Sequence, residues 1–208
     1  MKINLDQFPR ITSILRGFSI QETDRILEAL CESKIHSVEI AYNTPDASSI
    51  LRESIQKYGG RIVFGAGTVT CMEALKDVVD AGVDFVLSPI TFTREMLEYC
   101  KAHSVISVPG AFSPSEVAAQ FAYGADIVKI FPAVTVGPSY FRQLAGPMGY
   151  QRLMAVGGIN SKNAKEFIEA GADYLGIGSG MFRKEDVAAG NIEAMEKTIR
   201  SFEVALEL

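Results

Sequence analysis

The chain has 208 residues, of which 48% are hydrophobic and 22% are charged, so it can bury a sizeable core and is long enough for one eight-fold barrel. Its net charge of −5 argues against nucleic acid as the main partner, because binding a polyanion requires a basic face. The N-terminal residues do not read as a signal peptide, and no run of about 18 apolar residues occurs, so we expect no membrane span.

Short β-branched runs alternate with longer amphipathic segments from one end of the chain to the other. The predicted strands are residues 11–16, 37–41, 62–66, 85–88, 105–109, 127–131, 153–156 and 174–178. Among the predicted helices are residues 21–34, 71–82, 161–171 and the closing stretch 191–206. Eight such units without a linker predict a single-domain α/β protein, a (β/α)8 TIM barrel over residues 1–208. A doubly wound open sheet is the structural alternative.

Glycines and a capping sequence mark the expected helix boundaries. Gly82, Gly124 and Gly171 each follow a helix pattern just before the next strand, where glycine takes the left-handed conformation that ends a helix. The sequence at 113–116 combines an N-cap serine, a proline at the first helical position and an acid in the first turn. We therefore expect a helix to begin there.

The cysteines and histidines give no sign of a metal site. Cys31, Cys71 and Cys100 are odd in number and scattered through helix-like segments, which is typical of reduced packing residues in a cytoplasmic protein. His36 and His103 each stand between a helix pattern and a strand. Without a cluster of these residues, we expect no transition-metal site.

Six charged residues stand at the starts of predicted strands, on the barrel face where charges mostly serve stability. They are Arg10, Arg61, Asp84, Asp126, Arg152 and Asp173. We interpret all six as structural.

Arg16, Glu39 and Lys129 lie instead toward the C-terminal ends of apolar strands, and barrel enzymes form their active sites at that face. Strand alternation puts Lys129 on the same side as Ile127 and Phe131, where an unpaired ammonium is costly to bury. Either Lys129 points outward and snorkels between helices, or it points inward and desolvation lowers its pKa. The inward lysine would be a neutral amine available as a nucleophile.

Glu39 and Arg16 also allow two interpretations. Glu39 either pairs with a nearby helix or with Arg16, or it moves protons beside the lysine. Arg16 offers a guanidinium fork suited to a substrate carboxylate. The convergence of three charges on one barrel face favours the functional interpretation.

Glycines at the ends of the last two strands predict a phosphate site. Gly157 and Gly158 end the seventh strand, and Gly178 and Ser179 end the eighth. Barrels often bind phosphate with the backbone N–H groups of these two loops, and glycine lets the backbone approach the oxygens. Tight turns without a ligand are the structural alternative.

In order and spacing, the sequence resembles the class I 2-keto-3-deoxy-6-phosphogluconate/4-hydroxy-2-oxoglutarate aldolase family over nearly its whole length. The matching segments are residues 14–17, 38–40, 65–69, 108–110, 113–116, 128–132 and 157–159. The resemblance implies a lyase in which Lys129 is the Schiff-base lysine and Glu39 the general acid/base. It implies no metal and no cofactor, because the imine does what a Lewis acid would do.

The resemblance also implies which residues hold the substrate. Arg16 and Thr68 match residues that hold the carboxylate, and Phe131 matches the aromatic side chain next to the imine. Gly157, Gly158 and Ser179 match the phosphate site. The full set that we assign to substrate binding is Arg16, Thr68, Phe131, Asn43, Pro89, Gly157, Gly158, Gly178 and Ser179. The expected small-molecule partners are a phosphorylated 2-keto acid and pyruvate, and the family precedent predicts a homotrimer.

One departure from the family pattern concerns substrate choice. The gluconate-specific branch usually carries an arginine four residues after the glutamate, where this chain has Asn43. This step resembles the 6-phosphogalactonate branch, so we expect 2-dehydro-3-deoxy-6-phosphogalactonate as the substrate. A 4-hydroxy-2-oxoglutarate aldolase, a phosphosugar isomerase or epimerase with Glu39 as the base, and a non-catalytic sugar-phosphate sensor are the alternatives.

Overall fold

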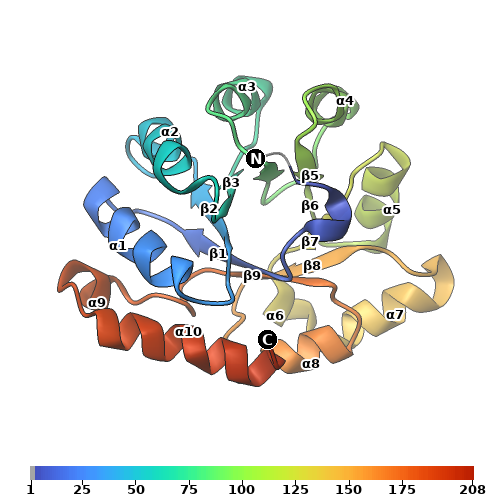
Figure 1. Ribbon diagram of the computed structural model, residues 1–208. Helices are drawn as coiled ribbons and strands as arrows, with labels where there is room; N and C mark the ends of the chain where they lie inside the picture. The colour runs from blue at the N-terminus through green and yellow to red at the C-terminus, as the bar shows by residue number, and fades with distance from the viewer. Residues whose placement is uncertain (1–2) are drawn as a thin grey trace.

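Parallel strands surround a central axis, and helices cover them on the outside, in the computed structural model, which describes residues 3–208 (Figure 1). The strands are β1 (Ile11–Leu15), β2 (Ser37–Ala41), β3 (Val63–Gly67), β4 (Phe85–Leu87), β5 (Ile106–Val108), β6 (Gly110–Ala111), β7 (Val128–Ile130), β8 (Leu153–Val156) and β9 (Tyr174–Ile177). Their order around the sheet is β5-β4-β3-β2-β1-β9-β8-β7-β6.

β5 and β6, the first and last strands in this order, are two halves of one barrel strand, which Pro109 divides. Proline has no N–H to donate to a neighbouring strand, so the ladder changes partner at this point. β5 pairs with β4, and β6 pairs with β7. The N–H of Ile127 donates to the carbonyl of Ser107 at 3.2 Å, and the N–H of Lys129 donates to that of Pro109 at 2.9 Å, which closes the barrel. The predicted (β/α)8 barrel is confirmed, and the open sheet is excluded.

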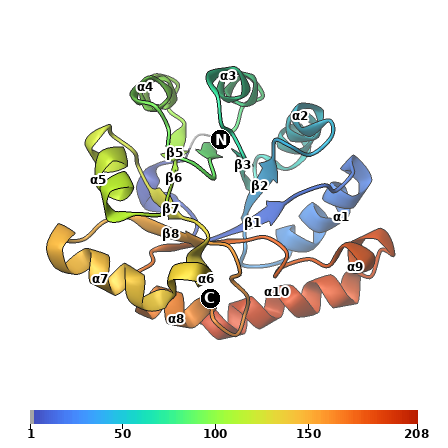
Figure 2. The ribbon, with the colours of Figure 1, turned by 180° about the vertical axis from the view of Figure 1, so that it is seen from behind.

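Helices follow the strands in the alternation that the sequence predicts. They are α1 (Ile20–Cys31), α2 (Ala47–Tyr58), α3 (Met72–Asp80), α4 (Arg94–Ala102), α5 (Pro114–Ala122), α6 (Ala133–Val136), α7 (Pro138–Met148), α8 (Ala164–Glu169), α9 (Lys184–Ala188) and α10 (Ile192–Leu206). Figure 2 shows the barrel from the end at which α6 lies. None of the helices in residues 3–208 has the length and apolar character that crossing a membrane requires.

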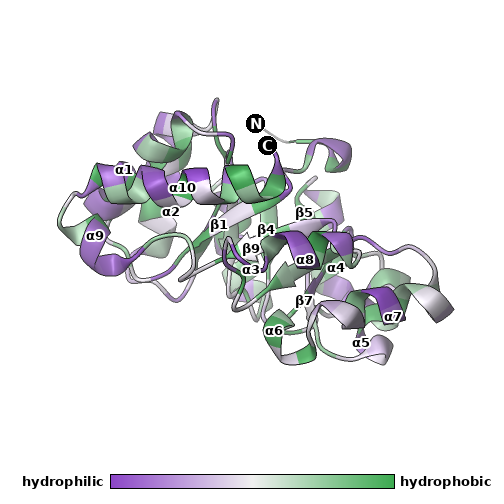
Figure 3. Ribbon diagram, turned by 90° about the horizontal axis from the view of Figure 1, so that it is seen from below, coloured by the Kyte–Doolittle hydropathy of each residue, from purple (hydrophilic) through white to green (hydrophobic). Residues whose placement is uncertain are grey.

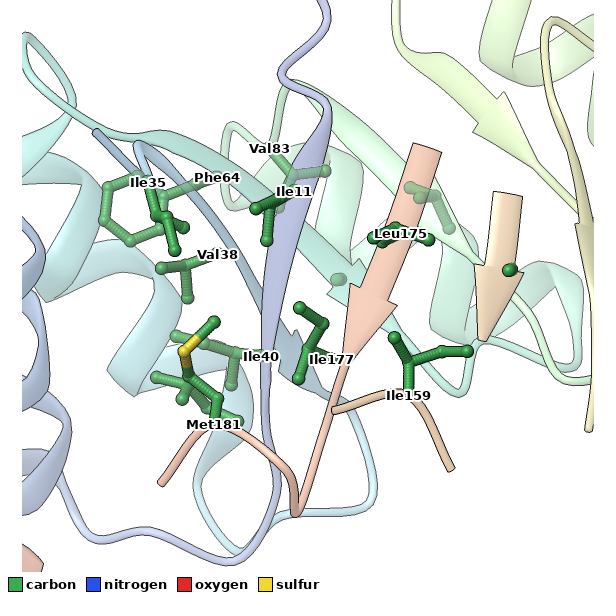
Figure 4. Close-up of a cluster of buried hydrophobic side chains, with 14 of the residues drawn as sticks. Ile11, Ile35, Val38, Ile40, Phe64, Val83, Ile159, Leu175, Ile177 and Met181 are labelled. Carbon is green, nitrogen blue, oxygen red and sulfur yellow. The ribbon is translucent and has the colours of Figure 1, made fainter. Parts of the chain in front are cut away.

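Alternation along the strands divides the buried side chains into two clusters. On β2, Val38 and Ile40 belong to an outer cluster between strands and helices, which Figure 4 shows together with Leu175 and Ile177 of β9. A smaller inner cluster fills the barrel and includes Ile127. The helices carry hydrophobic stripes beside hydrophilic ones (Figure 3), as expected for helices that cover a barrel. Side chains on the inner face of a strand are therefore the ones that can reach a site at the barrel mouth.

The helices predicted over 71–82 and 191–206 match the structure within two residues, whereas the helix predicted over 21–34 ends at Cys31 and the one over 161–171 is shorter at both ends. Gly82, Gly124 and Gly171 have φ of 94°, 97° and 108°, the left-handed values expected after a helix. Ser113 caps α5 with a complete capping box. The helix predicted over 161–171 begins only at Ala164, because side chains of residues 160 and 163 accept backbone N–H groups of this segment and form a turn instead.

The opposite end of the barrel is closed and serves stability. Asp84, Asp126 and Asp173 each accept a hydrogen bond from a backbone N–H of the preceding barrel strand, as the structural interpretation predicts. The donors are Phe64 at 3.1 Å, Ser107 at 2.8 Å and Leu153 at 3.1 Å. Phe8, which follows the short helix η1 (Leu5–Gln7), packs edge-on against Phe85 and Tyr174, with ring centroids 5.0 and 5.2 Å apart.

Candidate active site

Arg16, Glu39 and Lys129 line one cavity of about 340 Å³ at the C-terminal end of the strands. Lys129 lies on the inner face of β7, because its neighbours Val128 and Ile130 pack outward in the outer cluster. Only 5% of Lys129 and 1% of Glu39 are exposed. The lysine therefore points into the barrel and does not snorkel between the helices.

Burial controls the charge of both central groups. Desolvation lowers the pKa of Lys129, against the carboxyl of Glu39, which raises it, and Arg16 lowers it further. Desolvation likewise raises the pKa of Glu39, which the charges of Lys129 and Arg16 lower. Within residues 3–208, no hydrogen bond or ion pair joins Glu39 to either cation, and Glu39 Oε2 is a buried oxygen without a partner. Burial thus shifts Lys129 toward its neutral amine and Glu39 toward its protonated form.

The carboxyl of Glu39 is packed directly on the backbone of β3. A Cβ added at Gly67 would lie 1.5 Å from Glu39 Oε1 and 2.0 Å from its Cδ. Gly67 is opposite Ala41 in the β2–β3 register, so the two strands meet at this height in the barrel. Only a residue without a side chain leaves room for the acid in this position.

Arg16 is held by two polar side chains from the neighbouring loops. Its Nη1 donates to Asn43 Oδ1 at 3.0 Å, and its Nη2 donates to Thr68 Oγ1 at 3.2 Å. Thr68 adopts a positive φ of 60°, which is rare for a β-branched residue and marks a constrained position. Asn43 and Thr68 do not line the cavity, so they act on it through the orientation of Arg16.

The other predicted site residues form the cavity wall. Phe131 follows β7, and its ring centroid lies 4.9 Å from Lys129 Nζ. The remaining members of the predicted set on this wall are Pro89, Gly157, Gly158, Gly178 and Ser179. Gly157 and Gly158 have φ of 98° and 76°, conformations that favour glycine.

The two glycine loops offer free backbone donors. The N–H groups of Gly157, Gly158, Gly178 and Ser179 donate no hydrogen bond to another group in the described part of the chain. Unpaired N–H groups gathered on a cavity wall suit an anion with several oxygens, such as a phosphate. Among residues 3–208 there is no group of three or more His, Cys, Asp or Glu side chains arranged to hold a metal ion.

Comparison with known protein families identifies the chemistry of this fold. A family model described as KDPG and KHG aldolase matches residues 5–198. The chain belongs to this family. The protein is therefore an aldolase and a lyase, and the isomerase, epimerase and sensor alternatives lose their support.

Individual relatives of the aldolase agree with this assignment. A protein of Rhizobium meliloti (strain 1021), named probable 2-dehydro-3-deoxy-6-phosphogalactonate aldolase, is 28% identical over 88% of this chain and 85% of its own. The solved native KDPGal structure has a TM-score of 0.88 and 25% identity, over 97% of this chain and 95% of that chain. KDPG aldolase from Legionella pneumophila, solved with pyruvate captured at low pH as a covalent carbinolamine intermediate, has a TM-score of 0.86 and 26% identity, over 95% and 96% of the two chains.

The aldolase cavity also contains residues that the sequence interpretation missed. Lys184, the first residue of α9, lines the wall near the glycine loops. The apolar part of the wall includes Phe18, Ile159 and Phe182. The position of Lys184, a few residues beyond the predicted phosphate glycines, was the signal that would have found it.

Proposed function

We propose that this aldolase forms a Schiff base between Lys129 and the C2 ketone of a phosphorylated 2-keto-3-deoxy sugar acid, and cleaves the substrate into pyruvate and D-glyceraldehyde 3-phosphate. The observation that carries the proposal is a buried lysine, with a lowered pKa, in the same cavity as a buried acid with a raised pKa. Burial supplies the uncharged amine that nucleophilic attack requires, and the acid can exchange protons with the intermediates.

The first half of the reaction builds the imine. The Lys129 amine attacks C2, and the resulting carbinolamine loses its hydroxyl as water when Glu39 donates a proton, directly or through a water molecule. The nitrogen is then a protonated imine, which withdraws electrons from the C3–C4 bond. The deprotonated Glu39 is left ready to act as a base.

The second half breaks the bond and regenerates the amine. Glu39 removes the proton of the C4 hydroxyl, the C3–C4 electron pair moves into the imine, and D-glyceraldehyde 3-phosphate leaves. The enamine that remains takes a proton at C3. Water then adds to the imine carbon, and pyruvate is released from Lys129.

Substrate orientation follows from the two ends of the cavity. Arg16 donates one N–H each to Asn43 and Thr68 and keeps its other guanidinium N–H groups for the substrate carboxylate. The free N–H groups of the glycine loops face the phosphate. Asn43, in place of the arginine expected in the gluconate branch, favours 2-dehydro-3-deoxy-6-phosphogalactonate over the gluconate epimer. The short keto acid 4-hydroxy-2-oxoglutarate is the alternative substrate.

Reductive trapping tests the proposal. Treatment with pyruvate and borohydride should add one reduced pyruvyl group to the protein, and peptide mass spectrometry should place it on Lys129. The variant Lys129→Met should give no adduct, whereas Lys162→Met, which removes an exposed lysine, should trap pyruvate normally. Full turnover in Lys129→Met, or loss of activity on treatment with chelators, would overturn the mechanism.

We also propose that the aldolase works as a homotrimer in the cytoplasm. Support for the trimer comes from the family resemblance and from exposed apolar side chains near the barrel mouth, Ile90, Phe112 and Val134. Three free cysteines suit a reducing compartment. Light scattering at micromolar concentration should give the trimer mass, and a monomer would refute the assembly.

A further inference from the structure

Lys184 places a positive charge on the cavity wall that the mechanism above does not use. It lines the cavity, and its Nζ would be 3.1 Å from a Cβ added at Gly17. Gly17 has a positive φ of 70° and no side chain, so the lysine can lie over the loop that follows β1. In the described part of the chain, Lys184 Nζ makes no hydrogen bond and no ion pair within 4 Å.

Neighbouring contacts fix the segment that carries Lys184. Arg25 of α1 donates from Nη1 to the carbonyls of Val187 and Ala188 at 3.1 and 3.3 Å, at the C-terminal end of α9. The nearest acid on α1, Glu22, is occupied by the capping box of that helix and accepts from the N–H of Ser19 at 2.7 Å. The segment is thus fixed at the cavity, and the exposed ammonium of Lys184 feels the charge of Glu22 without forming an ion pair with it, so it is available to a ligand.

The topology separates Lys184 from Arg16. β1 lies between β2 and β9 in the barrel. Arg16 turns toward the loops after β2 and β3, where its partners Asn43 and Thr68 lie. Lys184 follows β9, the other neighbour of β1, and its Nζ reaches the loop at Gly17 in the cavity that the glycine loops after β8 and β9 also line. The two cations of the cavity therefore come from different elements, Arg16 from the end of β1 and Lys184 from the segment after β9.

The charge of the wall suits a substrate that is anionic at both ends. Its ionisable residues are Arg16, Glu39, Lys129 and Lys184. When the two central groups are neutral, Arg16 and Lys184 carry the remaining charge. A carboxylate can pair with the first, and a doubly charged phosphate can pair with the second while it accepts from the backbone N–H groups.

We propose that Lys184 binds the phosphate of the substrate and makes the aldolase selective for phosphorylated over unphosphorylated 2-keto acids. This inference rests on the proposed function, because it needs a substrate with a distal phosphate. The backbone N–H groups supply directed hydrogen bonds, and the ammonium supplies a full positive charge, which neutral N–H groups lack.

Steady-state kinetics of Lys184→Met test the inference. With the phosphorylated substrate, KM should rise about 10- to 100-fold, because a charge-assisted contact is lost, while kcat changes little. With unphosphorylated 4-hydroxy-2-oxoglutarate, kcat/KM should stay as in the wild type. Inhibition by inorganic phosphate should weaken in Lys184→Met and recover largely in Lys184→Arg.

The matched control is Arg183→Gln, which removes a neighbouring exposed cation that does not line the cavity. It should leave both substrates unaffected. Equal kinetics of Lys184→Met and wild type with the phosphorylated substrate would overturn the inference, as would a parallel loss with both substrates. Borohydride trapping of pyruvate reports on Lys129 alone, so a failed trap in the wild type would instead overturn the proposed function.

Discussion

Replacing Gly67 by alanine should displace the carboxyl of Glu39 and so disable it, although no charged residue is itself replaced. Gly67 lies in β3 without a positive φ, so the backbone itself accepts alanine. The new Cβ would lie 1.5 Å from Glu39 Oε1, whereas ordinary nonbonded carbon contacts are about 3.5 Å or longer. The carboxyl must therefore move by about 2 Å. Because a displacement of about 1 Å in a catalytic group can cost about 100-fold in rate, we expect kcat to fall at least that far.

Pyruvate release, coupled to NADH oxidation by lactate dehydrogenase, measures this loss, and thermal unfolding shows whether the variant is folded. Gly65→Ala is the control, because its Cβ would lie 2.1 Å from the ring of Phe85 and not against the acid. Both variants overpack the barrel and should lose about 1–3 kcal/mol of stability, but only Gly67→Ala should lose most of kcat. A folded Gly67→Ala enzyme with near wild-type kcat would refute the role given to the position of Glu39.

Three further outcomes are expected. Lys129→Met should abolish turnover and yet raise the free energy of unfolding at pH 7 by about 1 kcal/mol or more, since an apolar side chain replaces a buried ionisable one. Burial lowers the pKa of Lys129, so the unfolded wild type binds this proton more strongly than the folded state does. The stability gained by Lys129→Met should therefore shrink near pH 10, where the unfolded lysine also loses its proton. Urea titrations in which the gain grows with pH would contradict this sign. In the wild type, log kcat/KM should reach its plateau well below the ordinary pKa range of lysine, and an acid limb centred in that range would mean a charged resting Lys129. Asn43→Arg should shift the ratio of activities on the two C4 epimers toward the gluconate compound. An unchanged ratio in a coupled assay of pyruvate release would show that Asn43 does not determine which epimer is preferred.

Periodicity predicted the part of the site that belongs to strands. Side chains alternate along a strand, so Glu39 between the outward Val38 and Ile40 had to point into the barrel once both neighbours packed against helices. The same rule applies to Lys129. The strand boundaries were predictable for the same reason, except that β6 follows Pro109 as a separate pairing.

Contacts between loops were beyond the reach of the sequence. Arg16 meets Asn43 and Thr68, which are 27 and 52 residues away along the chain. Neither hydrogen bond follows from a local pattern, because each depends on how the loops pack at the barrel mouth. The position of Lys184 shortly after the phosphate glycines was a signal in the sequence, but that its side chain reaches the cavity depends on the packing of α9, which Arg25 of α1 contacts.

The hydrogen bonds of Arg16 have a consequence for the entropy of binding. A free arginine side chain carries about 2 kcal/mol of rotamer entropy, which a ligand must remove if it is the first partner to hold the guanidinium. Here Asn43 and Thr68 already hold it at 3.0 and 3.2 Å. Folding has therefore immobilised the side chain before any carboxylate arrives, and the preorganised fork lets even a ligand as small as pyruvate bind with little loss of disorder in the protein.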